Sequence, residues 1–214
     1  MALNEVRAFL FDVFGTVVDW RSGIARETAL FLRRNGAGSV DPFAFADAWR
    51  AEYQPAMEEV RSGRRPFTRL DVLHQENLES VLSKFGVNPA KTPRSELDEL
   101  NLAWHRLDPW PDSVAGLRRL KSNYVIAPLS NGNIALLLNM AKRASLSWDA
   151  ILGAEVVLAY KPAPEAYLRT AEVLGVRPEQ ICMVAAHKSR GGAKMRHADC
   201  LRSTPHRAWS EPNN

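Results

Sequence analysis

An uninterrupted run of apolar residues near the N-terminus predicts a short buried strand, Ala8–Phe11. The run ends at Asp12, and Gly15 and Thr16 follow closely. Open α/β sheets carry their reactive groups beyond the carboxyl ends of the strands, which is where Asp12 stands. Thr16 can hold this carboxylate or a bound anion through its hydroxyl. Two interpretations stay open: Asp12 is a nucleophile that forms an ester, or it only closes the strand and caps a turn.

Helical periodicity dominates the chain from residue 21 to about residue 107, and no strand pattern interrupts it. Glycines and prolines divide this stretch into separate helices. Because the insert follows the first strand directly, we expect it to lie over the carboxyl end of that strand as a cap. The predicted helices span residues 24–34, 41 to about 60, 68–85 and 93–105.

Beyond residue 109 the pattern changes to short apolar strands that alternate with amphipathic helices. This alternation predicts a parallel sheet with crossover helices, so the fold class is α/β with an inserted helical cap. The predicted strands span 124–129, 150–152 and 180–186, and the helices span 112–121, 134–143 and 164–174. The expected domains are a core of 1–19 and 108–195, a cap of 20–107 and an irregular tail of 196–214.

Polar residues stand at the ends of the predicted strands. Asp12 and Thr16 follow the first strand, Ser130 and Asn131 follow the second, and Lys161 precedes a later helix. In a parallel sheet such ends converge on one crevice. Together they suit a reaction in which Asp12 attacks and Lys161 offsets negative charge. Each also has an ordinary explanation alone, because Ser-Asn-Gly is a common turn and most lysines are solvated.

These motifs resemble, in their order along the chain, those of the haloacid dehalogenase superfamily: D-V-F-G-T from Asp12, S-N-G from Ser130 and K-P from Lys161. The resemblance extends over about residues 6–187 and implies a Rossmann-like core with a cap. Phosphatases of this superfamily carry a second aspartate where this chain has Phe14. Phenylalanine cannot protonate a leaving alkoxide, whereas a departing halide needs no proton. The stretch F-D-V-F-G-T-V-V-D-W is accordingly similar to the L-2-haloacid dehalogenases (haloacid dehalogenase type II).

The resemblance implies hydrolysis of short L-2-haloalkanoic acids to 2-hydroxy acids through an ester on Asp12, with no metal or organic cofactor. Lys161 is expected to pair with Asp12, and Thr16 and Ser130 to orient carboxylates. Asn131 is expected to hold the halide or the substrate. The segment A-W-R-A-E-Y supplies an arginine for the same purpose, Arg50. The further residues expected beside the substrate are Val13, Phe14, Tyr167 and His187.

The last part of the chain departs from the family pattern. An aspartate is expected a few residues after His187 to position the hydrolytic water, and Arg190 stands there instead. We therefore expect impaired ester hydrolysis. Residues 196–214 lack the pattern of the strand expected next, which suggests a frameshift. Permitted codons for residues 196–205 allow a neighbouring frame that reads Gly-Met-Arg-Thr-Ala-Phe-Val-Pro-Arg-Pro, which is similar to that strand.

Charge and composition limit the partners. The net charge is +4, and residues 188–214 account for all of it, so the body of the chain is neutral and offers no general basic field for nucleic acid. No apolar run approaches the length of a membrane span. The 2 cysteines form neither a disulfide framework nor a zinc site. We expect a cytoplasmic protein, and the resemblance implies a homodimer.

Two other functions stay open. The chain could be a phosphatase or phosphotransferase of the same superfamily, which magnesium-dependent turnover of a phosphate ester would identify. It could also be a catalytically inactive binding protein whose basic tail contacts nucleic acid in a salt-sensitive way. Phe14 and the segment around Arg50 favour the dehalogenase. The histidines without ligand spacing or an assigned role are His74, His105, His197 and His206.

Overall fold

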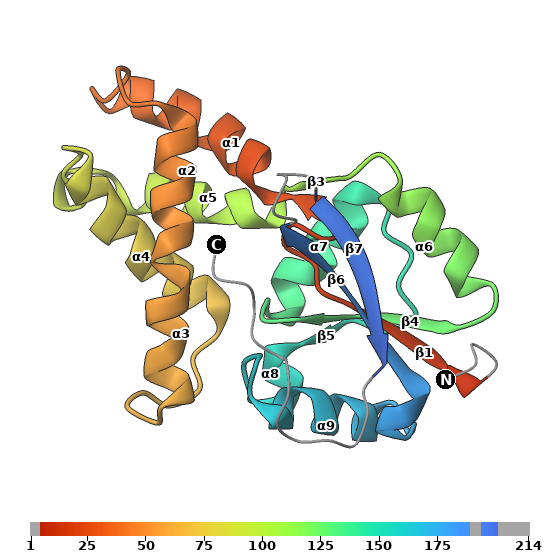
Figure 1. Ribbon diagram of the computed structural model, residues 1–214. Coiled ribbons are helices and arrows are strands. Elements are labelled where there is room, and N and C mark those ends of the chain that lie inside the picture. Colours follow the sequence, from red (N-terminus) through yellow and green to blue (C-terminus); the bar gives the residue numbers. More distant parts are fainter. Residues whose placement is uncertain (1–4, 189–193, 201–214) are drawn as a thin grey trace. The chain divides into compact units, whose positions relative to one another are not determined.

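A computed structural model describes residues 5–188 and 194–200, with side chains described through residue 186. The chain forms two compact units (Figure 1). One is an α/β unit, Met1–Val18 with Pro109–Asn214, and the other is a helical unit, Asp19–Asp108. The expected α/β class with a parallel sheet is confirmed.

The α/β unit is built on a five-stranded sheet in the order β5-β4-β1-β6-β7, which places the first strand in the middle (Figure 1). Strand β1 pairs in parallel with β4 on one side and β6 on the other. All of its residues are buried, which explains the continuous apolar run in place of alternation. The strands are β1 (Ala8–Phe11), β4 (Val125–Ser130), β5 (Leu152–Gly153), β6 (Ile181–Lys188) and β7 (Lys194–Cys200).

Strand β7 corrects the expectation that the chain becomes irregular at Arg196. It runs antiparallel to β6, from Lys188↔Lys194 to Cys182↔Cys200. An edge strand is held through main-chain hydrogen bonds to one neighbour and needs no strong apolar alternation, so the sequence pattern did not reveal it. Residues 201–214 of the expected tail lie outside the described residues.

Helices α6, α7 and α9 alternate with the strands, as the sequence pattern predicts. Helix α9 packs on the sheet through Ala166 and Ala171, which share a buried core with Leu10 of β1 and Met183 of β6. Helix α8 was not expected, because 4 residues are too few for a periodic signal. The helices of this unit are α6 (Ser113–Lys121), α7 (Ile134–Ala144), α8 (Ala154–Val157), α9 (Pro164–Val173) and the 3-10 helix η4 (Pro178–Gln180).

The helical unit contains two helices where one was expected over residues 41 to about 60, because the chain is interrupted at Glu52. Pro55 explains the break, since it lacks the N–H that would bond to Ala51 and its ring clashes with that carbonyl. Asp41 begins α2 by accepting a hydrogen bond from the N–H of Phe43 at 3.0 Å. The elements are α1 (Trp20–Arg34), α2 (Pro42–Ala51), α3 (Tyr53–Arg61), α4 (Leu70–Lys84), η2 (Pro89–Lys91), α5 (Arg94–Asn101) and η3 (Leu102–His105).

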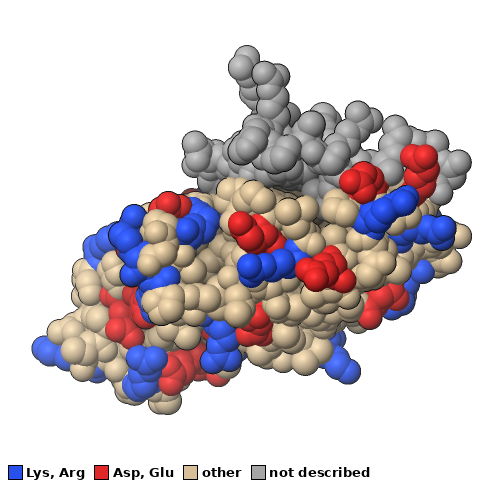
Figure 2. Space-filling model, turned by 90° about the horizontal axis from the view of Figure 1, so that it is seen from below, with Lys and Arg blue, Asp and Glu red and all other residues tan. Residues whose placement is uncertain are grey.

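The two connections between the units, β2 (Val18–Asp19) and β3 (Asp108–Pro109), pair with each other as a two-stranded sheet. Basic and acidic side chains are interspersed on the face shown in Figure 2. Ion pairs such as Arg65 with Glu76, at 2.6 Å, join the two signs, and this contact lowers the pKa of Glu76. Within residues 5–188 and 194–200, no helix has the length and apolar character needed to cross a membrane.

Candidate active site

The carboxylate of Asp12 lies directly beyond the end of β1, at the centre of the sheet. Its main-chain N–H donates to the carbonyl of Val184 in β6 at 2.9 Å. Thr16 Oγ1 donates to Oδ2 at 2.8 Å, and Lys161 Nζ donates to Oδ1 at 2.9 Å. Both carboxylate oxygens therefore have a partner, and the side chain stays 23% exposed. A carboxylate that is fixed, charged and accessible can act as a nucleophile.

Thr16 connects this carboxylate to the neighbouring strand. Its buried hydroxyl donates to Asp12 and accepts a hydrogen bond from the N–H of Ala186 at 2.9 Å. A hydroxyl can do both at once, which fixes its orientation. Gly15 has a φ of 86°, a conformation that favours glycine, and this residue lets the chain turn back toward Asp12. The contact with Ala186 could not be predicted, because a backbone donor leaves no mark in the sequence.

Lys161 is buried, with only 4% of its surface exposed, and its ammonium pairs with Asp12 at 2.9 Å. The main chain of Lys161 is held by Asn131, whose Oδ1 accepts from the Lys161 N–H at 2.8 Å. The Asn131 amide also donates to the Lys161 carbonyl at 3.5 Å. The structure thus brings Asp12, Thr16, Asn131 and Lys161 together, as the strand ends predict. Asn131 therefore positions the main chain of Lys161, a contact that goes beyond its expected role in holding the halide or the substrate.

Ser130 lies at the end of β4, and its hydroxyl accepts a hydrogen bond from the N–H of Gly132 at 3.1 Å. This contact is the one expected of an ordinary Ser-Asn-Gly turn. Gly153 approaches the turn so closely that a Cβ there would lie 2.4 Å from the carbonyl oxygen of Gly132. Only glycine fits, so β5 supports the turn that carries Asn131 toward Lys161.

Of the other residues expected beside the substrate, the structure describes the side chains of three and only the backbone of His187. Val13 and Phe14 are buried in the turn after β1, where the Val13 carbonyl accepts from the N–H of Val17 at 2.9 Å. Tyr167 lies in the core cluster beneath the sheet. The backbone of His187 pairs in β6, whereas its side chain lies outside the described part of the chain.

Arg50 belongs to the helical unit, on α2, and is described within that unit. Its guanidinium lies 3.7 Å from the ring centre of Tyr53 and 5.7 Å from that of Trp20. Its Nη1 is buried and has no hydrogen-bond partner among the described residues. In the part of the chain that the structure describes, aromatic faces and not a carboxylate hold the cation, so its charge is available to an anion.

His74, on α4 of the helical unit, is a buried histidine that motif spacing could not single out. Desolvation lowers its pKa from 6.5 to about 3, and the nearby Arg50 charge acts in the same direction. Asp71 opposes the shift. The imidazole is therefore neutral in the folded protein at neutral pH.

The low pKa of His74 predicts a specific dependence of stability on pH. Below 6.5 the unfolded chain protonates this residue, whereas the folded chain does so only near 3. The free energy of unfolding therefore falls as the pH drops through this range, by up to about 1.4 kcal/mol per unit. His74→Gln removes this contribution. Urea unfolding measures the free energy of unfolding of both proteins at about pH 7 and about pH 5. The wild-type value minus the His74→Gln value should be lower at about pH 5 than at about pH 7. An equal difference at the two pH values would contradict the assignment.

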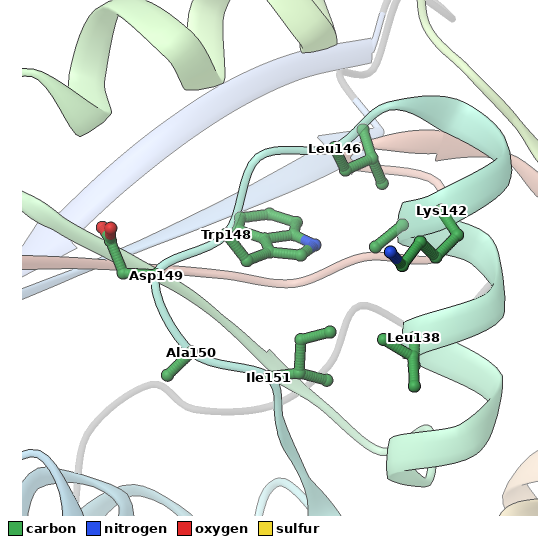
Figure 3. A pocket seen from close by; sticks show the side chains of 8 residues that line it. Leu138, Lys142, Leu146, Trp148, Asp149, Ala150 and Ile151 are labelled. Atoms are coloured by element: carbon green, nitrogen blue, oxygen red, sulfur yellow. The ribbon is translucent and has the colours of Figure 1, made fainter.

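A surface pocket of about 380 Å³ lies beside α7 and the segment before β5 (Figure 3). Trp148 lines it opposite Leu138 and Lys142, and the Trp148 ring packs on that of Phe11 at 5.5 Å between centroids. The acid of the pocket, Asp149, already accepts from the Ile126 N–H at 2.9 Å. None of the residues that line this pocket is a predicted site residue, so the pocket does not replace the site at Asp12.

The fold and the carboxylate site agree with the comparison to known families. The family model for haloacid dehalogenase-like hydrolases matches residues 6–185. The chain belongs to this family. The superfamily expected from the motifs is thereby confirmed.

Within the family, the relatives point to one activity. The chain is similar to (S)-2-haloacid dehalogenase 4A of Burkholderia cepacia, with 30% identity over 89% of this chain and 80% of the relative. It is similar to (S)-2-haloacid dehalogenase of Xanthobacter autotrophicus, with 30% identity over 88% and 71%. Among solved structures, a defluorinating L-2-haloacid dehalogenase matches with 55% identity and a TM-score of 0.83, over 86% of this chain and 74% of the other. The expected relationship to L-2-haloacid dehalogenases is confirmed.

Proposed function

We propose that this protein hydrolyses short L-2-haloalkanoic acids to 2-hydroxy acids through an ester on Asp12. The observation that carries the proposal is the Asp12 carboxylate, held between Lys161 and Thr16, with phenylalanine at position 14 in place of a proton donor. A carboxylate nucleophile followed two residues later by phenylalanine, which cannot protonate a leaving group, suits displacement of halide. The relatives with this activity support the same conclusion.

In the first step, a carboxylate oxygen of Asp12 attacks C2 of the substrate from the side opposite the halogen. The new C–O bond forms as the carbon–halogen bond breaks, the halide leaves with the bonding electrons, and C2 is inverted. Thr16 and Lys161 fix the carboxylate for this approach, which removes the entropic cost of aligning it. A structure of the Xanthobacter autotrophicus relative holds covalently bound chloropropionic acid, which agrees with an ester intermediate.

In the second step, water attacks the carbonyl carbon of the Asp12 ester, and the bond from this carbon to the ester oxygen on C2 breaks. The 2-hydroxy acid leaves with that oxygen and one proton of the water, and the second proton passes to the solvent. Asp12 is regenerated as a carboxylate with one oxygen from the water. Esterification removes the negative charge of Asp12, so the buried Lys161 ammonium is then available to the oxyanion that forms during hydrolysis.

We expect ester hydrolysis to be the slow step in this chain, because Arg190 stands where the family places a water-positioning acid. Halide release should show a rapid phase of about one equivalent per active site, followed by slower turnover. Quenched-flow measurement of halide and 2-hydroxy acid after mixing with L-2-chloropropionate checks this. Equal rates for the two products from the first turnover would contradict it.

The decisive test of the function is release of chloride from L-2-chloropropionate without added metal. The D enantiomer is the matched control, because back-side attack by a fixed carboxylate discriminates between the two configurations. The product from the L substrate should be the D-2-hydroxy acid. No chloride release from folded protein with either enantiomer would reject the proposal. Magnesium-dependent cleavage of a phosphate ester would favour a phosphatase instead.

The proposal extends to finer points that rest on the family resemblance. We propose that Arg50 binds the halide or the substrate carboxylate, and that Val13, Phe14, Tyr167 and His187 border the substrate. We also propose a cytoplasmic homodimer that needs no metal or organic cofactor. Sedimentation equilibrium of the purified protein tests the dimer.

A further inference from the structure

The helical unit contains an aromatic cluster around Arg50, formed by Trp20, Tyr53, His74 and Trp104. Trp20 and Trp104 stack with ring centres 6.2 Å apart, and Trp104 and His74 stack with ring centres 4.3 Å apart. Both pairs are inclined by 22°. These rings form a column, and the Arg50 guanidinium lies over Tyr53 and Trp20. The aromatic cluster thus places the half-buried Arg50 cation against apolar rings.

Two helices hold this arrangement together. Trp49, next to Arg50 on α2, donates through its indole N–H to the carbonyl of His74 on α4 at 3.0 Å. His74 and Asn77 stand three residues apart on α4, so they lie on one side of that helix. The position of the imidazole relative to Arg50 is therefore set by the α2–α4 contact.

Both ring nitrogens of His74 are buried and have no hydrogen-bond partner in the described part of the chain. A neutral imidazole always carries one N–H, so at least one donor of His74 is unsatisfied. Arg50 Nη1 and Asn77 Nδ2 are also buried donors without a hydrogen-bond partner among the described residues. A buried donor that is left unpaired destabilises the folded protein, which makes a bound acceptor favourable.

The partner that suits these groups is an acceptor with negative charge. A guanidinium can only donate, and a neutral imidazole and an amide NH₂ can donate beside it. A monatomic anion accepts hydrogen bonds from several directions. Halide is also the anion that the proposed reaction releases.

We propose that His74 completes a halide site in the helical unit by donating its ring N–H to the anion that Arg50 binds. This inference rests on the proposed function for the identity of the anion. His74 is a halide-binding residue in this scheme, and the column of rings holds its donor in place.

The site should be insensitive to pH around neutrality. The charged and titratable groups that act on His74 are Arg50 of α2, Asp71 of its own helix and His105 of η3. The Asp71 carboxylate lies 3.1 Å from Nε2 of His105 and accepts a hydrogen bond when that nitrogen carries the proton. Because His74 stays neutral, halide affinity should stay flat from about pH 8 to about pH 5. A protonating His74 would instead strengthen anion binding as the pH falls.

Direct binding of bromide tests the proposal without catalysis. Bromide quenches tryptophan fluorescence, and a site beside Trp20 should add a saturable component to the linear collisional quenching. His74→Phe and His74→Leu, which lack the N–H, should weaken bromide binding about tenfold or more. His74→Gln keeps an N–H donor and should stay near the wild-type affinity. His105→Gln is the matched control, because this histidine already has Asp71 as a partner.

The wild-type protein offers a second measurement that does not depend on how the variants fold. The ¹⁵N signal of the His74 ring should shift during a bromide titration, and formate at equal concentration should not reproduce the shift. Bromide affinity within about twofold of wild type in a folded His74→Phe or His74→Leu protein would overturn the proposal, as would an unchanged ring signal. Saturable bromide binding without dehalogenation would reject the proposed reaction and leave the anion site standing.

Discussion

Asp12→Asn is expected to lower chloride release from L-2-chloropropionate by about 10⁴-fold or more, the scale seen when a nucleophile is removed. An amide oxygen is a far weaker nucleophile than a carboxylate, and the amide leaves Lys161 without its counter-charge. Asparagine keeps the size of the side chain, so the turn after β1 should form. Steady-state chloride release, with circular dichroism to verify the fold, checks the result.

The matched control for this substitution is Asp112→Asn, which changes an exposed aspartate of the same α/β unit. Asp112 has no part in the proposed chemistry, so activity should stay within about twofold of the wild type. Activity of Asp12→Asn within about tenfold of the wild type would show that another group attacks the substrate.

Lys161→Met is expected to reduce chloride release by about 10³-fold, and we expect it to lower the free energy of unfolding by about 1–2 kcal/mol. Methionine fills similar space without the charge, so the Asp12 carboxylate keeps Thr16 as its partner and loses the ammonium at 2.9 Å. Breaking a fully buried pair costs about 3–5 kcal/mol, and the 23% exposure of Asp12 reduces that cost. Chloride release and urea unfolding measure the two effects.

A double-mutant cycle measures the interaction energy between Asp12 and Lys161 apart from their contacts with other residues. Because Asp12 and Lys161 are in contact, their effects on stability should not add in the Asp12→Asn, Lys161→Met protein. Lys121→Met is the control, since this lysine pairs with Asp149 at 3.0 Å on the surface. It should leave activity unchanged. Additive effects at Asp12 and Lys161 would mean that the ion pair contributes little.

Part of the site could be predicted from the sequence because Asp12 and Asn131 directly follow strands β1 and β4. Lys161 lies between α8 and α9, so its contact with Asp12 does not follow from a strand end alone. The S-N-G motif supplied Asn131, although its contact with the Lys161 main chain was not expected. Local pattern and topology were sufficient to place a side chain that directly follows a predicted strand.

Features that depend on tertiary contacts could not be predicted in the same way. The edge strand β7 is held by its pairing with β6 and has little pattern of its own. His74 looked like an isolated histidine, because its stacking on Trp104 joins residues far apart in the chain. The break at Glu52 was predictable in principle, since Pro55 was present and its effect on the preceding turn is local.

The central position of β1 also bears on how the protein forms during its synthesis. Ala8 pairs with Val125 on one side and with Ile181 on the other, so both neighbours of β1 are made long after it. The helical unit is one continuous segment, Asp19–Asp108, and can fold as soon as it leaves the ribosome. The apolar strand β1 must wait unpaired until β4 emerges, and its other edge stays open until β6 follows. A ribosome that stalls before β6 would therefore hold a folded helical unit beside an exposed strand edge, which is a target for chaperones.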